Sequence, residues 1–76
     1  MKNRWVTFEY NDRDEKIEIH ANELGLKFLI SQLEKLLIEK SDLHLMTPSW
    51  GGDELSEEKQ CETNKLISHV KIFHWE

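Results

Sequence analysis

A single amphipathic helix, predicted over residues 22–40, most constrains what this chain can fold into. Apolar side chains recur there every three or four residues, which is the spacing of one helical face. The stripe consists of Leu26, Leu29, Ile30, Leu33, Leu36 and Leu37. Asn22 supplies a capping side chain, and the helix should end near Glu39 or Lys40. Gly25 lowers helix propensity in the first turn, so we expect it to let the helix start approach a sheet closely.

Alternating apolar and polar residues predict strands on both sides of this helix. The alternation covers residues 5–10, 16–20, 42–46 and 65–75. The side chains expected to face inward are Val6, Phe8, Tyr10, Ile17, Ile19, Leu43, Leu45, Leu66, Ser68, Val70 and Ile72. This order predicts an α+β fold, a small ββαββ domain with one amphipathic helix packed on a four-stranded antiparallel sheet. We expect residues 1–76 to form a single domain.

The opposite face of the predicted sheet has no second helix to cover it. On this register it displays Trp5, Glu18, His20, His44, Met46, His69, Lys71, Phe73 and Trp75. Aromatic surface of this extent on a small sheet favours either a partner or a covering loop. The partner could be another protein or a second copy of the chain, and the long polar segment 47–64 could be the cover.

Composition limits the classes of function. The chain has 15 acidic and 10 basic residues and a formal net charge of −5, which argues against nucleic acid because phosphate binding needs basic patches. The first residues lack the apolar core of a signal peptide, and no apolar run is long enough to span a membrane. The single cysteine, Cys61, cannot form an internal disulfide, so we expect a cytoplasmic protein. No phosphate-binding or nucleophile motif is present, and we expect no enzyme.

The sequence HLMTPSWGGD at residues 44–53 holds the only proline and two of the three glycines around a tryptophan. Proline restricts φ and glycine permits positive φ, so this composition predicts a rigid turn. Its structural positions would be Thr47, Pro48, Gly51 and Gly52. Two interpretations of Trp50 remain open, because it could plug the end of a thin core or, with Ser49 and Asp53, be presented to a partner.

The segment after the turn, residues 53–62, contains five acidic residues and one basic residue. It is either a solvated loop or short helix, or an acidic arm that occupies the basic site of another protein. On the second interpretation the partner-binding residues are Trp50, Ser49, Asp53, Glu54, Glu57, Glu58, His44 and Trp75.

A metal site formed by histidines is a further alternative. If the strands bring His20, His44 and His69 together on the uncovered face, three imidazoles could converge on a metal ion. No local ligand spacing such as HxxxH or CxxC supports such a site, and exposed strand histidines explain the pattern as well. We therefore assign no metal ligand and no cofactor.

The string HLMTPSWGGDELSEEKQ, followed by HVKIFHWE, resembles the immunity protein 32 family of bacterial polymorphic toxin systems. The Leu-Gly-Leu at residues 24–26 is similar too, so the resemblance covers nearly the whole chain. It implies a cytoplasmic protein of bacterial competition that binds and neutralises a cognate toxin by direct contact. The positions that match the family signature are His44, Thr47, Ser49, Trp50, Gly51, Gly52, Asp53 and Leu55. The acidic charge leads us to expect a basic toxin domain, such as a nuclease.

Overall fold

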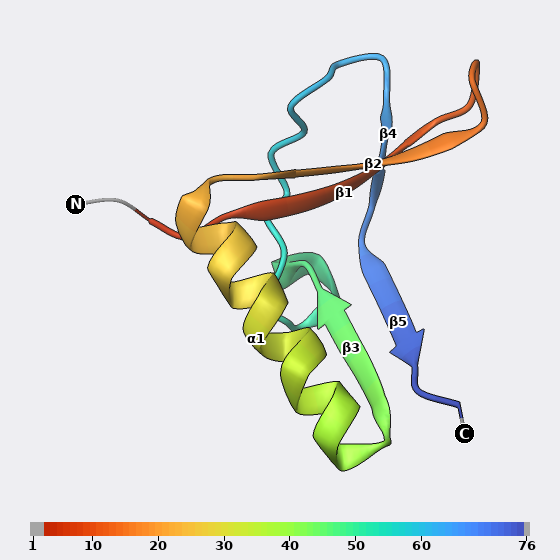
Figure 1. The fold of residues 1–76 in the computed structure, drawn as a ribbon. Coiled ribbons are helices and arrows are strands. Elements are labelled where there is room, and N and C mark those ends of the chain that lie inside the picture. Colours follow the sequence, from red (N-terminus) through yellow and green to blue (C-terminus); the bar gives the residue numbers. More distant parts are fainter. Residues whose placement is uncertain (1–2, 76) are drawn as a thin grey trace.

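The computed structural model of the chain describes residues 3–75, which form one long helix and two small antiparallel sheets (Figure 1). The α+β class is therefore as predicted, and the ends of the predicted domain 1–76 lie outside the described residues. The elements are β1 (Val6–Asn11), β2 (Lys16–Ala21), α1 (Glu23–Glu39), β3 (Asp42–Met46), the 3₁₀ helix η1 (Pro48–Trp50), β4 (Lys65–Ile67) and β5 (His69–Phe73).

Five strands in two sheets replace the single four-stranded sheet that the sequence predicts. The first sheet has the order β2-β1-β4, and the second pairs β3 with β5. The predicted last strand is two strands because the pairing breaks at Ser68, whose carbonyl accepts a hydrogen bond from the Thr47 N–H at 3.0 Å. Figure 1 shows β4 and β5 following one another from one sheet into the other.

The break at Ser68 changes which side chains of this segment face the core. Ile67 packs against the core before the break, and Val70 packs against it after the break. Strict alternation would place these two residues on opposite faces. The predicted continuous face through Leu66 and Val70 is therefore wrong, because each half of the segment takes its orientation from a different sheet.

Helix α1 has the limits that the sequence predicts. The Oδ1 atom of Asn22 accepts a hydrogen bond from the Gly25 N–H at 2.8 Å, which satisfies a backbone donor of the first turn. The helix ends where Lys40 adopts a left-handed conformation with φ 54°. The Lys40 N–H donates to the Leu36 carbonyl at 2.9 Å.

The rotation of α1 differs from the prediction. A methyl group on Gly25 would overlap the Trp5 carbonyl oxygen, so only the glycine side of the helix can approach β1 this closely. That side carries Leu29 and Leu36. Leu29 packs against the core, and Leu36 is buried. The rest of the stripe was wrongly predicted to be buried, and it remains 43–67 % exposed at Leu26, Ile30, Leu33 and Leu37.

The inward pair predicted on β2 is also exposed. Ile17 is 55 % and Ile19 is 51 % exposed, because α1 diverges from the β1-β2 hairpin along its length (Figure 1). The buried core instead lies between β1, β3 and the segment after η1, where it consists of Val6, Phe8, Leu45 and Leu55.

The second face of the three-stranded sheet is covered by the segment between η1 and β4. Thr7 and Glu9, which alternation directs toward solvent, are wholly buried beneath it. The Ser56 N–H donates to the Val6 carbonyl at 2.8 Å and anchors the start of this covering segment on β1. The predicted uncovered face is therefore absent from the three-stranded sheet. An uncovered face is present only on the two-stranded sheet of β3 and β5.

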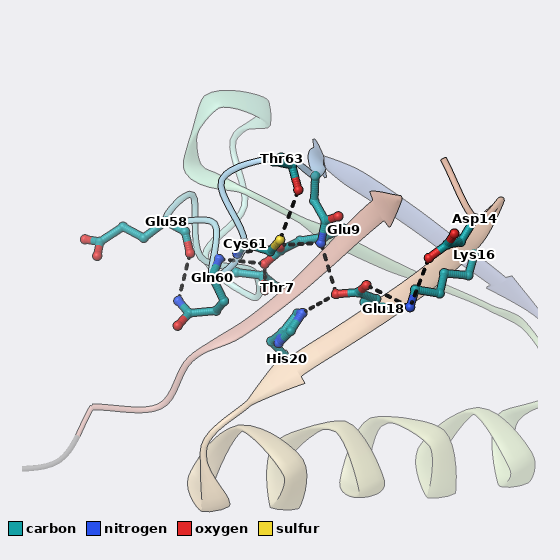
Figure 2. A network of polar contacts seen from close by, with 11 residues as sticks. Thr7, Glu9, Asp14, Lys16, Glu18, His20, Glu58, Gln60, Cys61 and Thr63 are labelled. Carbon is teal, nitrogen blue, oxygen red and sulfur yellow. Dashed lines mark hydrogen bonds and ion pairs between the residues drawn. The ribbon is translucent and has the colours of Figure 1, made fainter. Parts of the chain in front are cut away.

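The carboxylate of Glu9 holds the other end of the covering segment (Figure 2). It accepts hydrogen bonds from the backbone N–H groups of Gln60 and Cys61 at 2.9 and 3.2 Å. The Thr7 hydroxyl donates to it at 2.6 Å and the Asn64 amide at 3.1 Å. A buried carboxylate thus satisfies backbone donors of a segment that has no regular secondary structure.

Burial and hydrogen bonding shift the pKa of Glu9 in opposite directions. Burial by itself raises the pKa of this carboxyl, but the hydrogen bonds from Gln60, Thr7, Asn64 and Cys61 outweigh it and lower the pKa from 4.5 to about 2. A carboxyl whose pKa is lower in the folded state contributes stability above its unfolded pKa. This contribution disappears as the pH falls from about 4.5 toward 2.

We predict that Glu9→Gln lowers the free energy of unfolding at pH 7 by about 3 kcal/mol, the value of such a pKa shift. The difference from wild type should shrink steadily as the pH falls toward 2, where the wild-type carboxyl begins to be protonated in the folded state as well. Urea unfolding at several pH values measures both effects. Glu62→Gln, an exposed change in the same segment, serves as the control. A pH-independent difference would contradict the proposed charge–hydrogen-bond mechanism.

Candidate functional site

The HLMTPSWGGD motif forms a compact turn around η1. The Thr47 carbonyl accepts hydrogen bonds from the N–H groups of Trp50 at 2.9 Å and Gly52 at 3.1 Å. Pro48 occupies the first turn of η1, where its missing N–H costs nothing. Gly51 has φ 88°, which a side chain would strain, and its N–H donates to the Pro48 carbonyl at 3.0 Å. Backbone hydrogen bonds therefore close the predicted turn.

The same turn directs the following residues into the protein. A methyl group on Gly52 would lie 2.7 Å from the Cβ and carbonyl oxygen of Met46, so the chain passes too close to β3 for any side chain. The Leu55 N–H donates to the Met46 carbonyl at 3.1 Å, and Leu55 is only 3 % exposed in the core. Thr47 is wholly buried as well. Leu55 therefore closes this end of the core, and of the two interpretations of Trp50 the one that made it a core plug is wrong.

Trp50 points outward from this turn and is 59 % exposed. Its indole ring packs on His69 of β5 with 5.5 Å between ring centroids, and His69 stacks on His44 of β3 at 5.4 Å. These contacts attach the turn to the solvent-facing side of β3 and β5. We call this surface the outer face, and it consists of Asp42, His44, Trp50, His69, Lys71, Phe73 and Trp75.

A short chain of polar contacts orients the two imidazoles of the outer face. His44 Nε2 lies 3.0 Å from Asp42 Oδ2, and His44 Nδ1 lies 3.2 Å from His69 Nε2. A carboxylate only accepts, so His44 Nε2 carries a proton; when the ring is neutral, its Nδ1 accepts from His69. The hydrogen bond from His44 lowers the pKa of Asp42. Asp42 was not among the predicted site residues; the signal for it is its spacing of two residues from His44 on one strand face.

Aromatic side chains form the other end of the outer face. Phe73 is 52 % and Trp75 is 84 % exposed, and their rings lie 6.3 Å apart. The Lys71 ammonium lies 4.9 Å from the Phe73 ring centroid and 3.8 Å from Asp42 Oδ2. The outer face thus combines exposed aromatic rings with groups of both charges.

The acidic residues predicted to bind a partner separate into two pairs. Glu54 accepts a hydrogen bond from the Met46 N–H at 3.0 Å, and Glu57 accepts one from the exposed Ser49 N–H at 2.9 Å. These two carboxylates hold the turn. The side chains of Asp53 and Glu58 make no hydrogen bond or ion pair within residues 3–75, and Figure 2 shows Glu58 directed away from the Glu9 contacts.

Asp53 and Glu58 line an open recess of about 420 Å³ between the covering segment and the residues preceding β1. Arg4 and Trp5 line it as well. Arg4 is held there, because its guanidinium donates to the Asp53 carbonyl at 3.2 Å and lies 3.8 Å from the centroid of the Phe28 ring. The recess therefore presents carboxylates beside the Arg4 guanidinium and the Trp5 side chain.

The structure brings His44 and His69 together but separates them from His20. His20 lies on β2, where its Nε2 is 2.8 Å from Glu18 Oε1 in the polar network of Figure 2. No group of three or more potential metal-ligating side chains occurs among residues 3–75. The three-histidine metal site is therefore wrong for geometric reasons, because the histidines belong to different sheets.

Comparison with known proteins now identifies the family. The model of the Immunity protein 32 family matches residues 16–70, which extend from β2 into β5. This chain belongs to the Immunity protein 32 family, as the resemblance in its sequence suggested. No curated protein and no solved structure matches the chain. Within the described residues, no helix combines the length and apolar character needed to cross a membrane.

We predict that Gly52→Ala destabilises the protein by about 1–3 kcal/mol, since the added methyl group forces β3 and the turn apart. Gly51→Asn is the matched comparison, because no atom lies within 4 Å of a side chain there and asparagine tolerates positive φ. Its effect should be clearly smaller. Chemical unfolding measures both, and equal losses would show that the closeness of Met46 is not the constraint.

Proposed function

We propose that this member of the Immunity protein 32 family is a cytoplasmic, non-catalytic antidote that binds a cognate bacterial toxin through the outer face. The family supports an immunity role and, in general, a toxin as partner. On this proposal the outer face covers the toxin domain. The recess beside Asp53 and Glu58 receives cationic side chains of the toxin, as expected for a basic domain such as a nuclease.

The observation that carries the proposal is the exposed indole of Trp50 on a rigid support. Its turn is closed by backbone hydrogen bonds, and His69 supports one side of its ring. An aromatic side chain held in this way loses little conformational entropy on binding, which is typical of interface hot spots. The rings of Phe73 and Trp75, at the other end of the outer face, extend the apolar contact area.

Charge provides the second support. The chain has a net charge of −5, and the carboxylates of Asp53 and Glu58 are not engaged by other described residues. Unpaired surface carboxylates attract a basic partner over a distance and mainly raise the association rate. The aromatic rings would then provide most of the affinity.

We predict that Trp50→Ala weakens toxin binding at least about tenfold while the fold is preserved, because an aromatic hot-spot residue contributes about 2 kcal/mol or more. The toxin is first captured from the native cell with the wild-type protein as bait and identified by mass spectrometry. Titration calorimetry then compares the variants. Ile38→Ala, another exposed apolar change but on α1, is the control. Unchanged affinity in folded Trp50→Ala would contradict a role of the outer face.

We predict that Asp53→Asn combined with Glu58→Gln slows association with the toxin about three- to tenfold at low salt, and much less at high salt. The dissociation rate should change little. Stopped-flow kinetics at two ionic strengths measures this. The matched pair Glu54→Gln and Glu57→Gln should instead lower stability, since those carboxylates hold the turn. Salt-independent rates would exclude the acidic recess from the interface.

A further inference from the structure

A second exposed surface, separate from the outer face, lies on the consecutive elements β2 and α1. It is entirely apolar, which is unusual in a chain that is one-third charged. Its side chains, all 43–67 % exposed, are Ile17, Ile19, Leu26, Ile30, Leu33 and Leu37. We call it the β2–α1 face. The toxin-binding proposal does not use it.

Strand β2 is also an edge strand. It pairs with β1 on one side, and the described residues provide no strand on its other side. Unpaired backbone N–H and C=O groups along an edge strand are a template for another strand, and natural proteins usually blunt or cover such edges. Here the edge lies beside apolar residues and carries no proline.

We propose that a second copy of this chain docks on the β2–α1 face and forms a two-fold symmetric homodimer. The two β2 strands pair antiparallel and join the three-stranded sheets into one sheet of six strands. The exposed stripes of the two α1 helices then pack beside each other on the same side of that sheet. A two-fold axis requires a self-complementary surface, because each copy contributes the same residues.

The charges of β2 are self-complementary in one antiparallel register. If the axis passes through Ile19, this residue faces its own copy and Glu18 of each chain faces His20 of the other. Ile17 then faces Ala21. No like charges are placed directly opposite each other, which is the arrangement that destabilises cross-strand pairs.

The apolar area of the β2–α1 face approaches what one partner contributes to a dimer interface of standard size. A fully buried leucine or isoleucine corresponds to about 100 Å² of apolar area, so the β2–α1 face offers roughly 300–400 Å². A standard interface buries about 800 Å² per partner, of which a little over half is apolar.

The first test is the mass of the protein in solution from low to high micromolar concentration, measured by sedimentation equilibrium. We expect twice the chain mass of 9.1 kDa for wild type. Ile19→Lys and Leu33→Lys should each raise the dimer dissociation constant at least about tenfold, because identical cations then meet at the axis or in the helix contact. Phe73→Lys, on the outer face, is the matched control and should remain dimeric. Circular dichroism verifies that all variants are folded.

A second test examines the register directly. In a Cys61→Ser background, Ile19→Cys should form a disulfide-linked dimer on oxidation, since residue 19 lies opposite itself. Ile38→Cys, an exposed position near the end of α1, should not. A monomeric wild type at high micromolar concentration overturns the proposal. So does a dimer that Phe73→Lys dissociates and Leu33→Lys does not.

These outcomes are independent of the proposed function. A folded Ile19→Lys variant that is monomeric and still binds the toxin supports two separate surfaces. If the toxin binds wild type but not Leu33→Lys, and wild type alone is monomeric, the β2–α1 face belongs to the toxin and the homodimer is wrong.

Discussion

The buried carboxylate of Glu9 is the interaction on which the long segment between η1 and β4 depends. That segment contributes only Leu55 to the buried core, so apolar packing alone cannot hold it. Glu9 binds one of its ends through backbone N–H groups, and the Val6 carbonyl binds the other. Because these bonds lie between the segment and β1, they also define the recess beside Trp5. A single ionised group thereby positions the covering segment where it lines the recess.

The TPSWGG turn serves two purposes that its sequence does not separate. Its inner residues close the core, since Thr47 is buried and Gly52 lets Leu55 pass close to β3. Its outer residue, Trp50, is supported by His69 rather than by the core. The family signature therefore combines residues that build the turn with residues that the turn displays. Rigidity links the two, because a displayed anchor is effective only when its support does not move.

The two exposed surfaces differ in chemistry, and this difference suggests different partners. The outer face mixes aromatic rings, imidazoles and charges of both signs, which suits selective recognition of a different protein. The β2–α1 face has only aliphatic side chains beside an open strand edge, which suits a second copy of the same chain. Both surfaces could be occupied together, because they belong to different sheets.

Local chemistry in the sequence determined the helix, its Asn22 cap, the β1-β2 hairpin, the rigid turn and the family, because each depends on residues close together in the chain. Tertiary structure decided three further features. Close approach of Gly25 to Trp5 set the rotation of α1 and left four of the six residues of its apolar stripe exposed. The break at Ser68 divided one predicted strand between two sheets and separated His20 from His44. Contacts across more than 50 residues buried Glu9, which alternation alone directs to solvent. Such contacts depend on how elements pack, and a local pattern does not contain that information.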